Sequence, residues 1–396
     1  MQTTGLLGDA LVLVPEAILD SGNGTANRSE ALVISGERVL GRLPKAEVPA
    51  LAARTRILSG GWILPGFVNL HDYLSVDADR PDPMGRMFSP DIASRAWSAA
   101  RALRRDLRSG VTTLRVMGEG DGFDLRAARA VREGEIEGPA LVTSGFPITP
   151  SHGHQRGARG FDGEEAIRHA VRENIRAGAD WIKLVLTGGV NSVGLGPRDA
   201  VYTRNEIRHA IDEARRAGRA VAASAHGGPA VRMAAEEGVA TIEHAALFDA
   251  EDVEAVALNG VTVVLTLSRF FAPEGIRRSA RDNPAILANL ERACAAMRAL
   301  VPALIARGVP IAIGTDNMHG HIGQDIAILA ELGAGIDMAL AAATSGGAAA
   351  LRRPDIGGLG PRMIADLVVL PGDPRHDPAL LTRPVEVFAR GRAVFG

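Results

Sequence analysis

Five ionisable side chains stand within or directly after short apolar runs of this sequence, where an unpaired charge would be costly. They are His71, Lys183, His226, His244 and Asp316. Imidazole and carboxylate groups are the donors that Zn²⁺ and neighbouring divalent metals prefer. One histidine at such a position is more often a hydrogen-bonded core residue than a ligand. The five together predict a centre for one or two divalent metals, with zinc as the expected ion.

Lys183 is unusual for its type as well as for its place. The chain has 44 basic residues, and only Lys45 and Lys183 are lysines. Lys183 lies in an apolar strand candidate, where a buried ammonium is costly to desolvate. A neutral amine can react with CO₂ to give a carbamate, which is anionic and could bridge two metals. The alternative is a side chain that reaches solvent or pairs with Asp316 alone.

Repeated β–α units are the elements expected to bring these residues together. From Trp62 onward, apolar runs alternate with segments of helical periodicity. The eight strand candidates are residues 62–71, 111–118, 140–146, 181–186, 220–227, 241–245, 261–268 and 311–317. They predict an α/β fold, a (β/α)₈ TIM-like barrel over residues 61–351 with its reactive groups at the carboxyl ends of the strands. Short β-like runs in residues 1–60 and 352–396 predict a small β-sandwich domain built from both chain ends.

Composition excludes several classes of function. The 44 basic and 46 acidic residues give a formal charge of −2, which argues against binding of nucleic acid or an anionic membrane. The sequence lacks a secretory signal pattern and any apolar run long enough to span a membrane. Its single cysteine, Cys294, is expected to be a buried structural thiol. We therefore expect a soluble, cytoplasmic protein that acts on a small molecule or a peptide.

Several ordered motifs resemble those of one family. PGFVNLH, GADWIKLVLTGGV, AASAHG followed by EEGVATIEH, and IAIGTD are similar to motifs of the amidohydrolase superfamily, particularly its prolidase-like branch. The tail GGLGPRMIADLVVLPGDP resembles the closing segment of the family's small β domain. The resemblance implies that Asp316 is the general base and a metal ligand, and that Lys183 is carboxylated. It also implies His71 as a ligand of the first metal, and His226 and His244 as ligands of the second.

Two further expectations depend on the resemblance alone. Relatives often assemble, so a homo-oligomer is expected by analogy. The Arg-rich, Lys-poor composition is also similar to that of amidohydrolases of bottromycin-type pathways, which remove a follower peptide beside a thiazoline.

The sequence departs from the family pattern at one important position. The strand-1 motif of the family is His-x-His, and here its second position is Tyr73. A phenol has a pKa of about 10 and binds metal well only as phenolate. The first metal position therefore loses a good donor, which favours a single metal. Three roles stay open for Tyr73: a weak ligand, a hydrogen-bond donor to the reacting carbonyl, or an inert replacement.

Polar residues on the predicted loops at the barrel mouth are candidates for contact with substrate. His154 is a further catalytic candidate. The candidate substrate-binding residues are His152, Tyr202, Arg269 and His319, with His321 near the same loops. Together they predict a polar pocket able to hold a carboxylate or a peptide group.

The expected reaction is hydrolysis of an amide C–N bond by metal-activated water, with Asp316 as general base. The expected substrate is a dipeptide or an N-acyl amino acid. A deaminase of a cyclic amidine or guanidine is the first alternative, although such relatives have a glutamate three residues after the strand-5 histidine, where this chain has Pro229 after His226. A metal-poor protein that binds a ligand without catalysis is the second, and Tyr73 motivates it.

Overall fold

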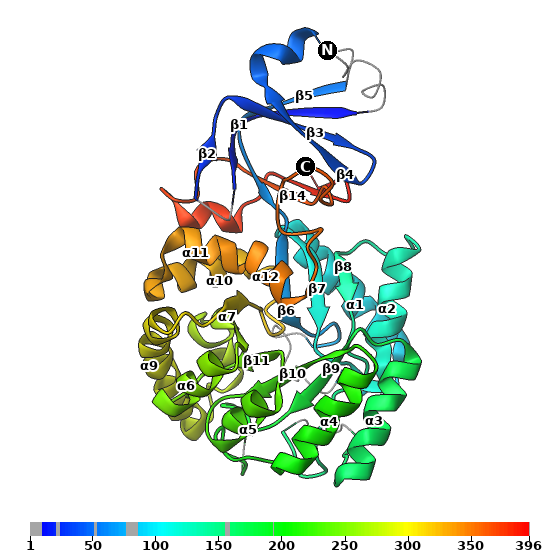
Figure 1. Cartoon of the computed structure of the whole chain (residues 1–396), viewed down its shortest axis with the longest axis vertical. Helices are drawn as coiled ribbons and strands as arrows, with labels where there is room; N and C mark the ends of the chain where they lie inside the picture. The colour runs from blue at the N-terminus through cyan, green and yellow to red at the C-terminus, as the bar shows by residue number, and fades with distance from the viewer. Residues whose placement is uncertain are drawn as a thin grey trace.

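The molecule has two parts, a smaller β-rich end and a larger α/β body (Figure 1). The structure is a computed structural model that describes residues 10–20, 24–50, 54–76, 86–154, 159–192 and 194–395. Strands from both ends of the chain meet in the smaller part. The larger part holds the repeated β–α units.

The smaller part is one mixed sheet of eight strands, in the order β16-β15-β14-β5-β1-β3-β4, with β2 paired to β1. The strands are β1 (Leu11–Leu19), β2 (Ala26–Asn27), β3 (Glu30–Ser35), β4 (Arg38–Pro44), β5 (Arg54–Pro65), β14 (Leu367–Leu370), β15 (Glu386–Ala389) and β16 (Arg392–Phe395). A 3-10 helix, η1 (Lys45–Ala50), follows β4.

The sequence predicts a sandwich of two sheets here, whereas the described strands form a single sheet. The long strand β5 explains the difference, because it pairs with β1 along one edge and with β14 along the other. The two chain ends therefore join edge to edge instead of stacking face to face. The boundaries of the two predicted domains stay predictions.

Eight strands of the larger part follow one another in sequence order, and every pair is parallel. They are β6 (Phe67–Asp72), β7 (Val111–Val116), β8 (Ala140–Val142), β9 (Trp181–Val185), β10 (Ala220–Ala225), β11 (Thr241–His244), β12 (Thr262–Leu265) and β13 (Ile311–Ile313). Seven of them lie within the predicted strand segments, and β6 extends one residue beyond the first segment, to Asp72. The TIM-barrel type of the α/β fold is therefore confirmed.

The predicted closed barrel is not a continuous ladder of hydrogen bonds. Strands β6-β7-β8 form one sheet, and β9 to β13 form another. One strand at each gap, β8 or β13, has only three residues, which leaves few backbone groups to pair. An isolated parallel bridge joins Ile148 to Leu184 at one gap, and the Thr315 amide donates to the His71 carbonyl (3.0 Å) at the other.

Helices surround these strands. They are α1 (Ile92–Arg108), α2 (Phe123–Arg132), α3 (Glu164–Ala177), α4 (Arg204–Arg216), α5 (Pro229–Glu237), α6 (Ala250–Leu258), α7 (Leu267–Phe271), α8 (Ile276–Ser279), α9 (Pro284–Ala306), α10 (Ile322–Leu329), α11 (Gly335–Ala342) and α12 (Ser345–Ala350), with the short turns η2 (Gly120–Gly122), η3 (Ala330–Ala334) and η4 (Pro378–Thr382). Gly178 and Gly238 directly follow helices α3 and α5 as their C-caps, and their φ angles of 100° and 92° suit glycine.

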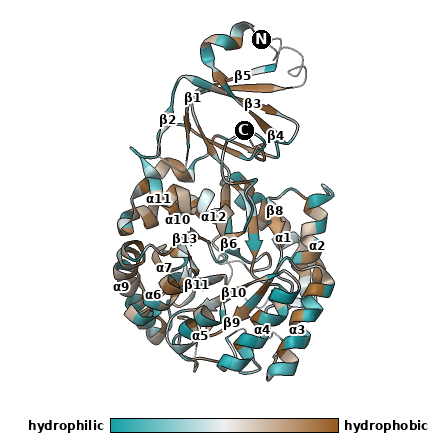
Figure 2. Ribbon diagram, in the orientation of Figure 1, coloured by the Kyte–Doolittle hydropathy of each residue, from teal (hydrophilic) through white to brown (hydrophobic). Residues whose placement is uncertain are grey.

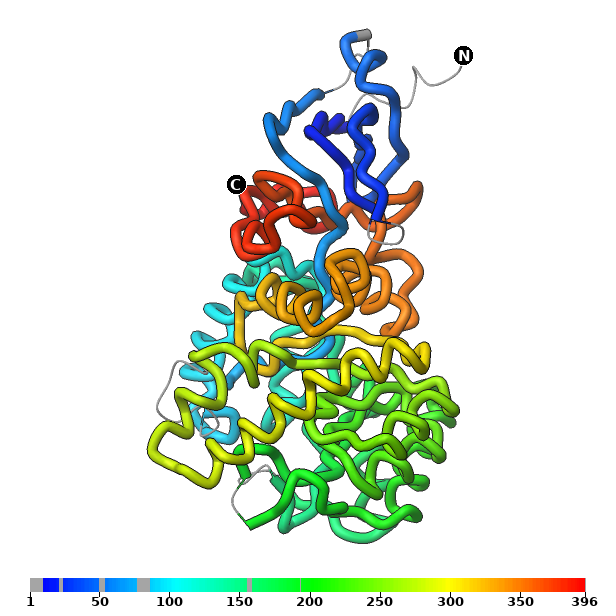
Figure 3. The backbone as a smooth tube through the Cα atoms, turned by 90° about the vertical axis from the view of Figure 1, so that its left-hand side faces the viewer, coloured from blue at the N-terminus to red at the C-terminus, as the bar shows by residue number. Residues whose placement is uncertain are grey.

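Apolar side chains fill the space between strands and helices, and Figure 2 shows hydrophobic residues along the central strands. The long helix α9, yellow in Figure 3, lies across the outside of the body. Cys294 on this helix is only partly buried, so the predicted buried thiol is not observed. None of the described helices combines the length and the apolar character needed to cross a membrane. The fully buried Arg115 and Lys183 are charged exceptions within this core.

Candidate active site

A cavity of about 60 Å³ opens at the carboxyl ends of strands β9 to β13. Its lining combines apolar, hydroxyl, imidazole and charged groups. The lining residues are Tyr73, His154, Val185, Thr187, Gly188, Gly189, Val190, Asn191, Ser224, His226, His244, Arg269, Phe270, Ile276, Asp316 and Asn317. Six of them are predicted site residues, from six separate places in the chain.

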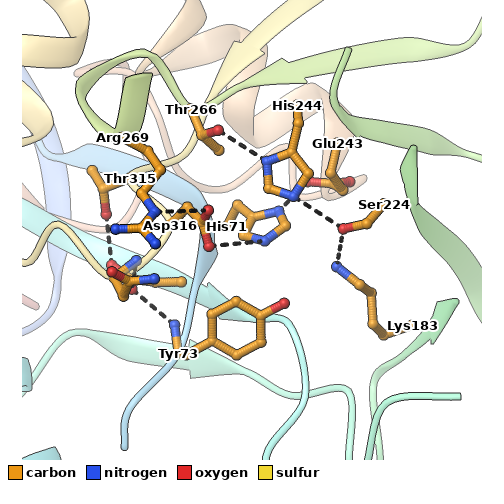
Figure 4. Close-up of polar contacts among 12 residues, drawn as sticks. His71, Tyr73, Lys183, Ser224, Glu243, His244, Thr266, Arg269, Thr315 and Asp316 are labelled. Carbon is orange, nitrogen blue, oxygen red and sulfur yellow. Dashed lines mark hydrogen bonds and ion pairs between the residues drawn. The ribbon is translucent and has the colours of Figure 1, made fainter. Parts of the chain in front are cut away.

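His71, at the end of β6, lies fully buried beside this cavity (Figure 4). Its Nδ1 is 2.9 Å from Oε2 of Glu243, and its Nε2 is 3.8 Å from Oδ1 of Asp316. Burial, together with the Lys183 charge, holds the imidazole pKa well below its usual value, so the ring is neutral. Donation from Nδ1 to a carboxylate leaves the lone pair on Nε2, the arrangement typical of histidine ligands.

The Nε2 atom of His71 supports a metal at this point. It is buried and has no hydrogen-bond partner among the described residues. A lone pair without a partner, opposite the Asp316 carboxylate, matches what a divalent cation requires of its ligands. These residues therefore fit a metal ion.

Close contact between β13 and β6 places Asp316 opposite His71. The Asp316 amide donates to the His71 carbonyl (2.8 Å). A Cβ atom on Gly314 would lie only 2.3 Å from the His71 Cβ, so glycine is required there. Asp316 and Asn317 then adopt φ angles of 48° and 65°, a left-handed conformation that is uncommon for residues other than glycine.

The buried Asp72 carboxylate holds together two chain segments that border the cavity. Its Oδ1 accepts hydrogen bonds from the backbone amides of Tyr73 (2.8 Å) and Asn317 (2.7 Å). Its Oδ2 accepts from the Thr315 hydroxyl (2.6 Å) and the Asn69 amide (3.1 Å). One carboxylate thus ties the segment after β6 to the segment after β13.

A chain of hydrogen bonds connects the strands on the other side of the site. Lys183 Nζ donates to Ser224 Oγ (2.6 Å), which is 3.1 Å from His244 Nε2. His244 Nδ1 is 2.9 Å from Thr266 Oγ1. Burial lowers the pKa of Lys183 to about 8, so an amine fraction is available near neutral pH. Figure 4 shows Ser224 between the lysine and the imidazole.

His226 lies next to His244, but the two rings are stacked. Their centroids are 5.0 Å apart and their planes differ by 15°. Burial lowers the pKa of both imidazoles well below the usual value, so both are neutral. The Nδ1 atom of His226 is buried without a partner among the described residues.

Three more predicted residues line the cavity. Burial holds the pKa of Tyr73 well above its usual value, so the phenol is protonated, which favours the hydrogen-bond donor among its three open roles. Arg269, on α7, places Nε 3.7 Å from Asp316 Oδ2, and its Nη1 has no partner among the described residues. His154 forms a short contact through Nδ1 with the Ser192 hydroxyl.

The remaining predicted residues do not line the cavity. His152 is exposed, and the buried Tyr202 hydroxyl donates to the Phe161 carbonyl (2.8 Å). His319 lies behind the site, and His321 directly precedes α10 with its Nδ1 2.7 Å from Oε1 of Gln324. Proximity to a strand end in the sequence indicated the loop, but it did not indicate the direction of the side chain.

His319 belongs to a second cluster of possible metal donors. Asp72, Asp106 and His319 form the only group of three such residues, within the described part of the chain, whose donor atoms lie within 4.8 Å of one another. Both ring nitrogens are engaged, Nδ1 with Asp106 (2.9 Å) and Nε2 with the Val76 carbonyl (3.2 Å). Burial alone would lower the imidazole pKa, but the two carboxylates raise it to about 9. A charged imidazolium has no lone pair for a metal, so this cluster is an ion pair.

The residues that position the predicted site residues were not predicted from the sequence. Glu243 accepts from Arg115 Nη2 (2.8 Å) while it orients His71, and all three side chains are buried. Opposite charges inside the apolar strand candidates 111–118 and 241–245 were a usable signal for this pair. A serine such as Ser224 offered no comparable signal.

Comparison with known proteins identifies the family. A sequence model of the Amidohydrolase family matches residues 62–394. The chain belongs to the amidohydrolase family. This amidohydrolase is 27% identical over 340 residues to ochratoxinase of Aspergillus niger, which covers 78% of this chain and 70% of the relative.

Solved structures agree with this assignment. A prolidase complexed with N-methylphosphonate-L-proline superposes with a TM-score of 0.86 at 29% identity, over 98% of this chain and 99% of the other. A Xaa-Pro dipeptidase with bound methionine has the same TM-score at 22% identity, over 98% and 100% of the two chains, and shares the fold.

Family membership confirms the predicted class of enzyme. This amidohydrolase hydrolyses C–N bonds, and members of its family typically bind a divalent metal. The roles of the individual site residues stay predictions.

Proposed function

We propose that this amidohydrolase cleaves the amide bond of a dipeptide or an N-acyl amino acid whose free carboxylate binds Arg269. One observation carries the proposal. The Asp316 carboxylate lies between two different partners in one cavity, with His71 Nε2 3.8 Å from one oxygen and Arg269 Nε 3.7 Å from the other. A proton acceptor thus lies next to both a metal-binding nitrogen and a buried cation.

The metal would be held by His71 and Asp316, with a carboxylated Lys183 as a further anionic ligand. When bound, a divalent metal such as zinc supplies Lewis acidity, which makes water more acidic and a carbonyl more electrophilic. Glu243 fixes the His71 tautomer that leaves Nε2 free for this purpose.

The chain's own groups supply the remaining chemistry. Asp316 accepts the proton of the attacking water and returns it to the nitrogen of the leaving amine. The protonated Tyr73 hydroxyl donates a hydrogen bond to the carbonyl oxygen as negative charge develops there. The guanidinium of Arg269 binds the substrate carboxylate with donors such as its unused Nη1. Because Arg269 lies so close to Asp316, the amide that is cleaved should be near the carboxylate.

The related prolidase structure supports this substrate class, since it holds an amino-acid-like ligand, N-methylphosphonate-L-proline. A panel of N-acyl amino acids and dipeptides, each paired with its carboxamide analogue, tests the proposal. We expect hydrolysis of the acids and weak or no hydrolysis of the amides. A thiazoline-containing peptide belongs in the panel, because it tests the narrower follower-peptide activity.

Arg269→Met sharpens the test. The loss of a charge-assisted hydrogen bond costs about 1.5–3 kcal/mol, which corresponds to a fall in kcat/KM of roughly 10- to 150-fold for the acids. The carboxamides should lose little, because they lack the partner of Arg269. Arg277→Met on α8 is the matched control, since this side chain is 54% exposed. Equal losses for acids and amides would contradict the role of Arg269.

Two other outcomes would replace the proposal. Release of ammonia from cyclic amidines or guanidines, without amide hydrolysis, would indicate a deaminase. Less than one equivalent of bound metal, with no hydrolysis after metal is added, would indicate a binding protein without catalysis. The cytoplasmic location and a homo-oligomeric state stay predictions from sequence.

A further inference from the structure

We infer that Asn317 accepts a hydrogen bond from the N–H of the amide that is cleaved, so that this amidohydrolase prefers secondary amides to tertiary ones such as prolyl bonds. The inference rests on the proposed function, because it concerns the substrate of the same cavity. Asn317 directly follows Asp316, the proposed general base, and both residues line the cavity. The proposed reaction leaves the Asn317 carboxamide unused.

The carbonyl oxygen of this carboxamide lacks a partner. Asn317 is only 5% exposed, and its Oδ1 is buried with no hydrogen-bond partner among the described residues. A buried acceptor without a donor has given up its hydrogen bonds to water and gained none in return. Most buried polar side-chain atoms in proteins do have a partner. A ligand in the cavity that donates a hydrogen bond would satisfy this oxygen.

The main chain holds Asn317 in place without help from its carboxamide. The Asn317 amide donates to Oδ1 of Asp72 (2.7 Å), and the next amide, that of Met318, donates to the Thr315 carbonyl (3.2 Å). Asparagine tolerates a φ angle of 65° better than most residues, because its short side chain can form a local hydrogen bond. Oδ1 forms no such bond here. The local backbone therefore leaves Oδ1 available to a ligand.

The chemistry of an N-acyl amino acid identifies the donor. Its carboxylate and its carbonyl oxygen only accept hydrogen bonds, so the amide N–H is the donor that its polar groups offer. The nitrogen of this amide must also come close to Asp316, which returns a proton to it in the proposed reaction. Adjacent Cα atoms are about 3.8 Å apart, so Asn317 lies beside the residue that this nitrogen must reach.

A tertiary amide cannot make this contact. A prolyl or N-methylated nitrogen carries no hydrogen, so it would leave Oδ1 buried without a donor and would place a carbon atom against it. The loss of such a hydrogen bond should lower kcat/KM by about 5- to 150-fold. An N–H held at Oδ1 also fixes the orientation of the nitrogen while its lone pair receives the proton from Asp316.

A pair of substrates that differ by one methyl group tests the inference on the metal-loaded full chain. N-acyl-L-alanine has the N–H, and N-acyl-N-methyl-L-alanine lacks it. We expect the wild-type enzyme to prefer the first by about 5- to 150-fold in kcat/KM. Calorimetric measurement of the binding of both compounds gives the same comparison without catalysis.

Three variants locate the origin of this preference. Asn317→Gly removes the acceptor, and glycine adopts the same φ angle freely, so the preference should fall to within about twofold of equality. Asn317→Asp keeps an accepting oxygen and should keep the preference. Asn191→Gly is the matched control, because Asn191 lines the same cavity but is only partly buried. It should keep the ratio of the wild type.

Equal kcat/KM values for the two compounds in the wild type would overturn the inference, and so would a preference that survives Asn317→Gly. Loss of bound metal from Asn317→Gly, measured by elemental analysis, would also overturn it, because Oδ1 would then act on the ion. Hydrolysis of both compounds at equal rates would leave the proposed function intact. Hydrolysis of neither would contradict that function, and the ratio of the two binding constants would then decide the inference.

Discussion

Glu243→Gln should damage both the stability and the metal affinity of this amidohydrolase. The carboxylate accepts from Arg115 Nη2 at 2.8 Å through one oxygen and contacts His71 Nδ1 at 2.9 Å through the other. Glutamine preserves the shape and removes the charge. Whichever way its amide is turned, the NH₂ group faces a donor, either Arg115 or the Nδ1–H of His71.

The size of each effect follows from burial. Removal of one partner from a buried ion pair costs about 3–5 kcal/mol, because the Arg115 guanidinium remains buried without its counter-charge. Glutamine keeps one accepting oxygen, so we expect the lower end of this range. Loss of the group that orients a metal-binding imidazole lowers metal affinity by about 10- to 100-fold, which is about 1.4–2.7 kcal/mol.

Two measurements separate these effects. Urea denaturation of the chelator-treated protein reports stability without metal, and competition with a chromophoric chelator reports metal affinity. Glu386→Gln is the control. Glu386 is also buried and paired with Arg56 (2.7 Å), but it lies on β15, in the eight-stranded sheet of the smaller part. It should lose some stability and no metal affinity. A folded Glu243→Gln protein with metal affinity within twofold of the wild type would refute this account of His71.

Two further substitutions test the contacts that position the residues of the site. Gly314→Ala should lower stability by about 1–3 kcal/mol and weaken metal binding, because the added Cβ would collide with His71; unchanged denaturation and metal titration would contradict this contact. His319, whose pKa is raised to about 9, should contribute stability that is complete below about pH 6.5 and is lost as the pH rises through 9. His319→Gln should be less stable at pH 6 and should show a flatter denaturation midpoint between pH 6 and 10 than the wild type.

The strand plan of the larger part could be predicted because each strand is an apolar run with its own helix after it. The first predicted strand, residues 62–71, shows the limit of this prediction, because its residues belong to two different sheets. The chain passes from β5 to β6 at Gly66, where a Cβ atom would lie 2.2 Å from the Thr112 hydroxyl. A continuous apolar run in the sequence does not show that the strand changes its pairing partner. For the same reason, the sequence predicted a sandwich of two sheets where the structure has one mixed sheet.

Ligand candidates could be found because histidine, lysine and aspartate are rare within apolar strands. Their partners depend on register, which one sequence does not show. Ser224 faces the site because β10 pairs with β9 so that Ala222 lies opposite Lys183, and with β11 so that Ser224 lies opposite Glu243. A shift of one residue would turn the hydroxyl to the other face.

The charges around the site predict that the state of Lys183 decides whether metal binds. The guanidinium groups of Arg115 and Arg269 balance the carboxylates of Glu243 and Asp316, and the histidines are neutral. A Lys183 ammonium would leave this group with a positive charge, which repels a divalent cation. A carbamate on the same nitrogen reverses the sign and adds an anionic ligand.

Metal loading should therefore depend on bicarbonate. The amine fraction that reacts with CO₂ grows as the pH approaches the Lys183 pKa of about 8. Wild-type protein loaded at pH 8 with bicarbonate should retain more metal than protein loaded in CO₂-free buffer, whereas Lys183→Met should bind weakly in both. Equal loading of the wild type with and without bicarbonate would contradict the carbamate, and it would require another source of negative charge beside His71.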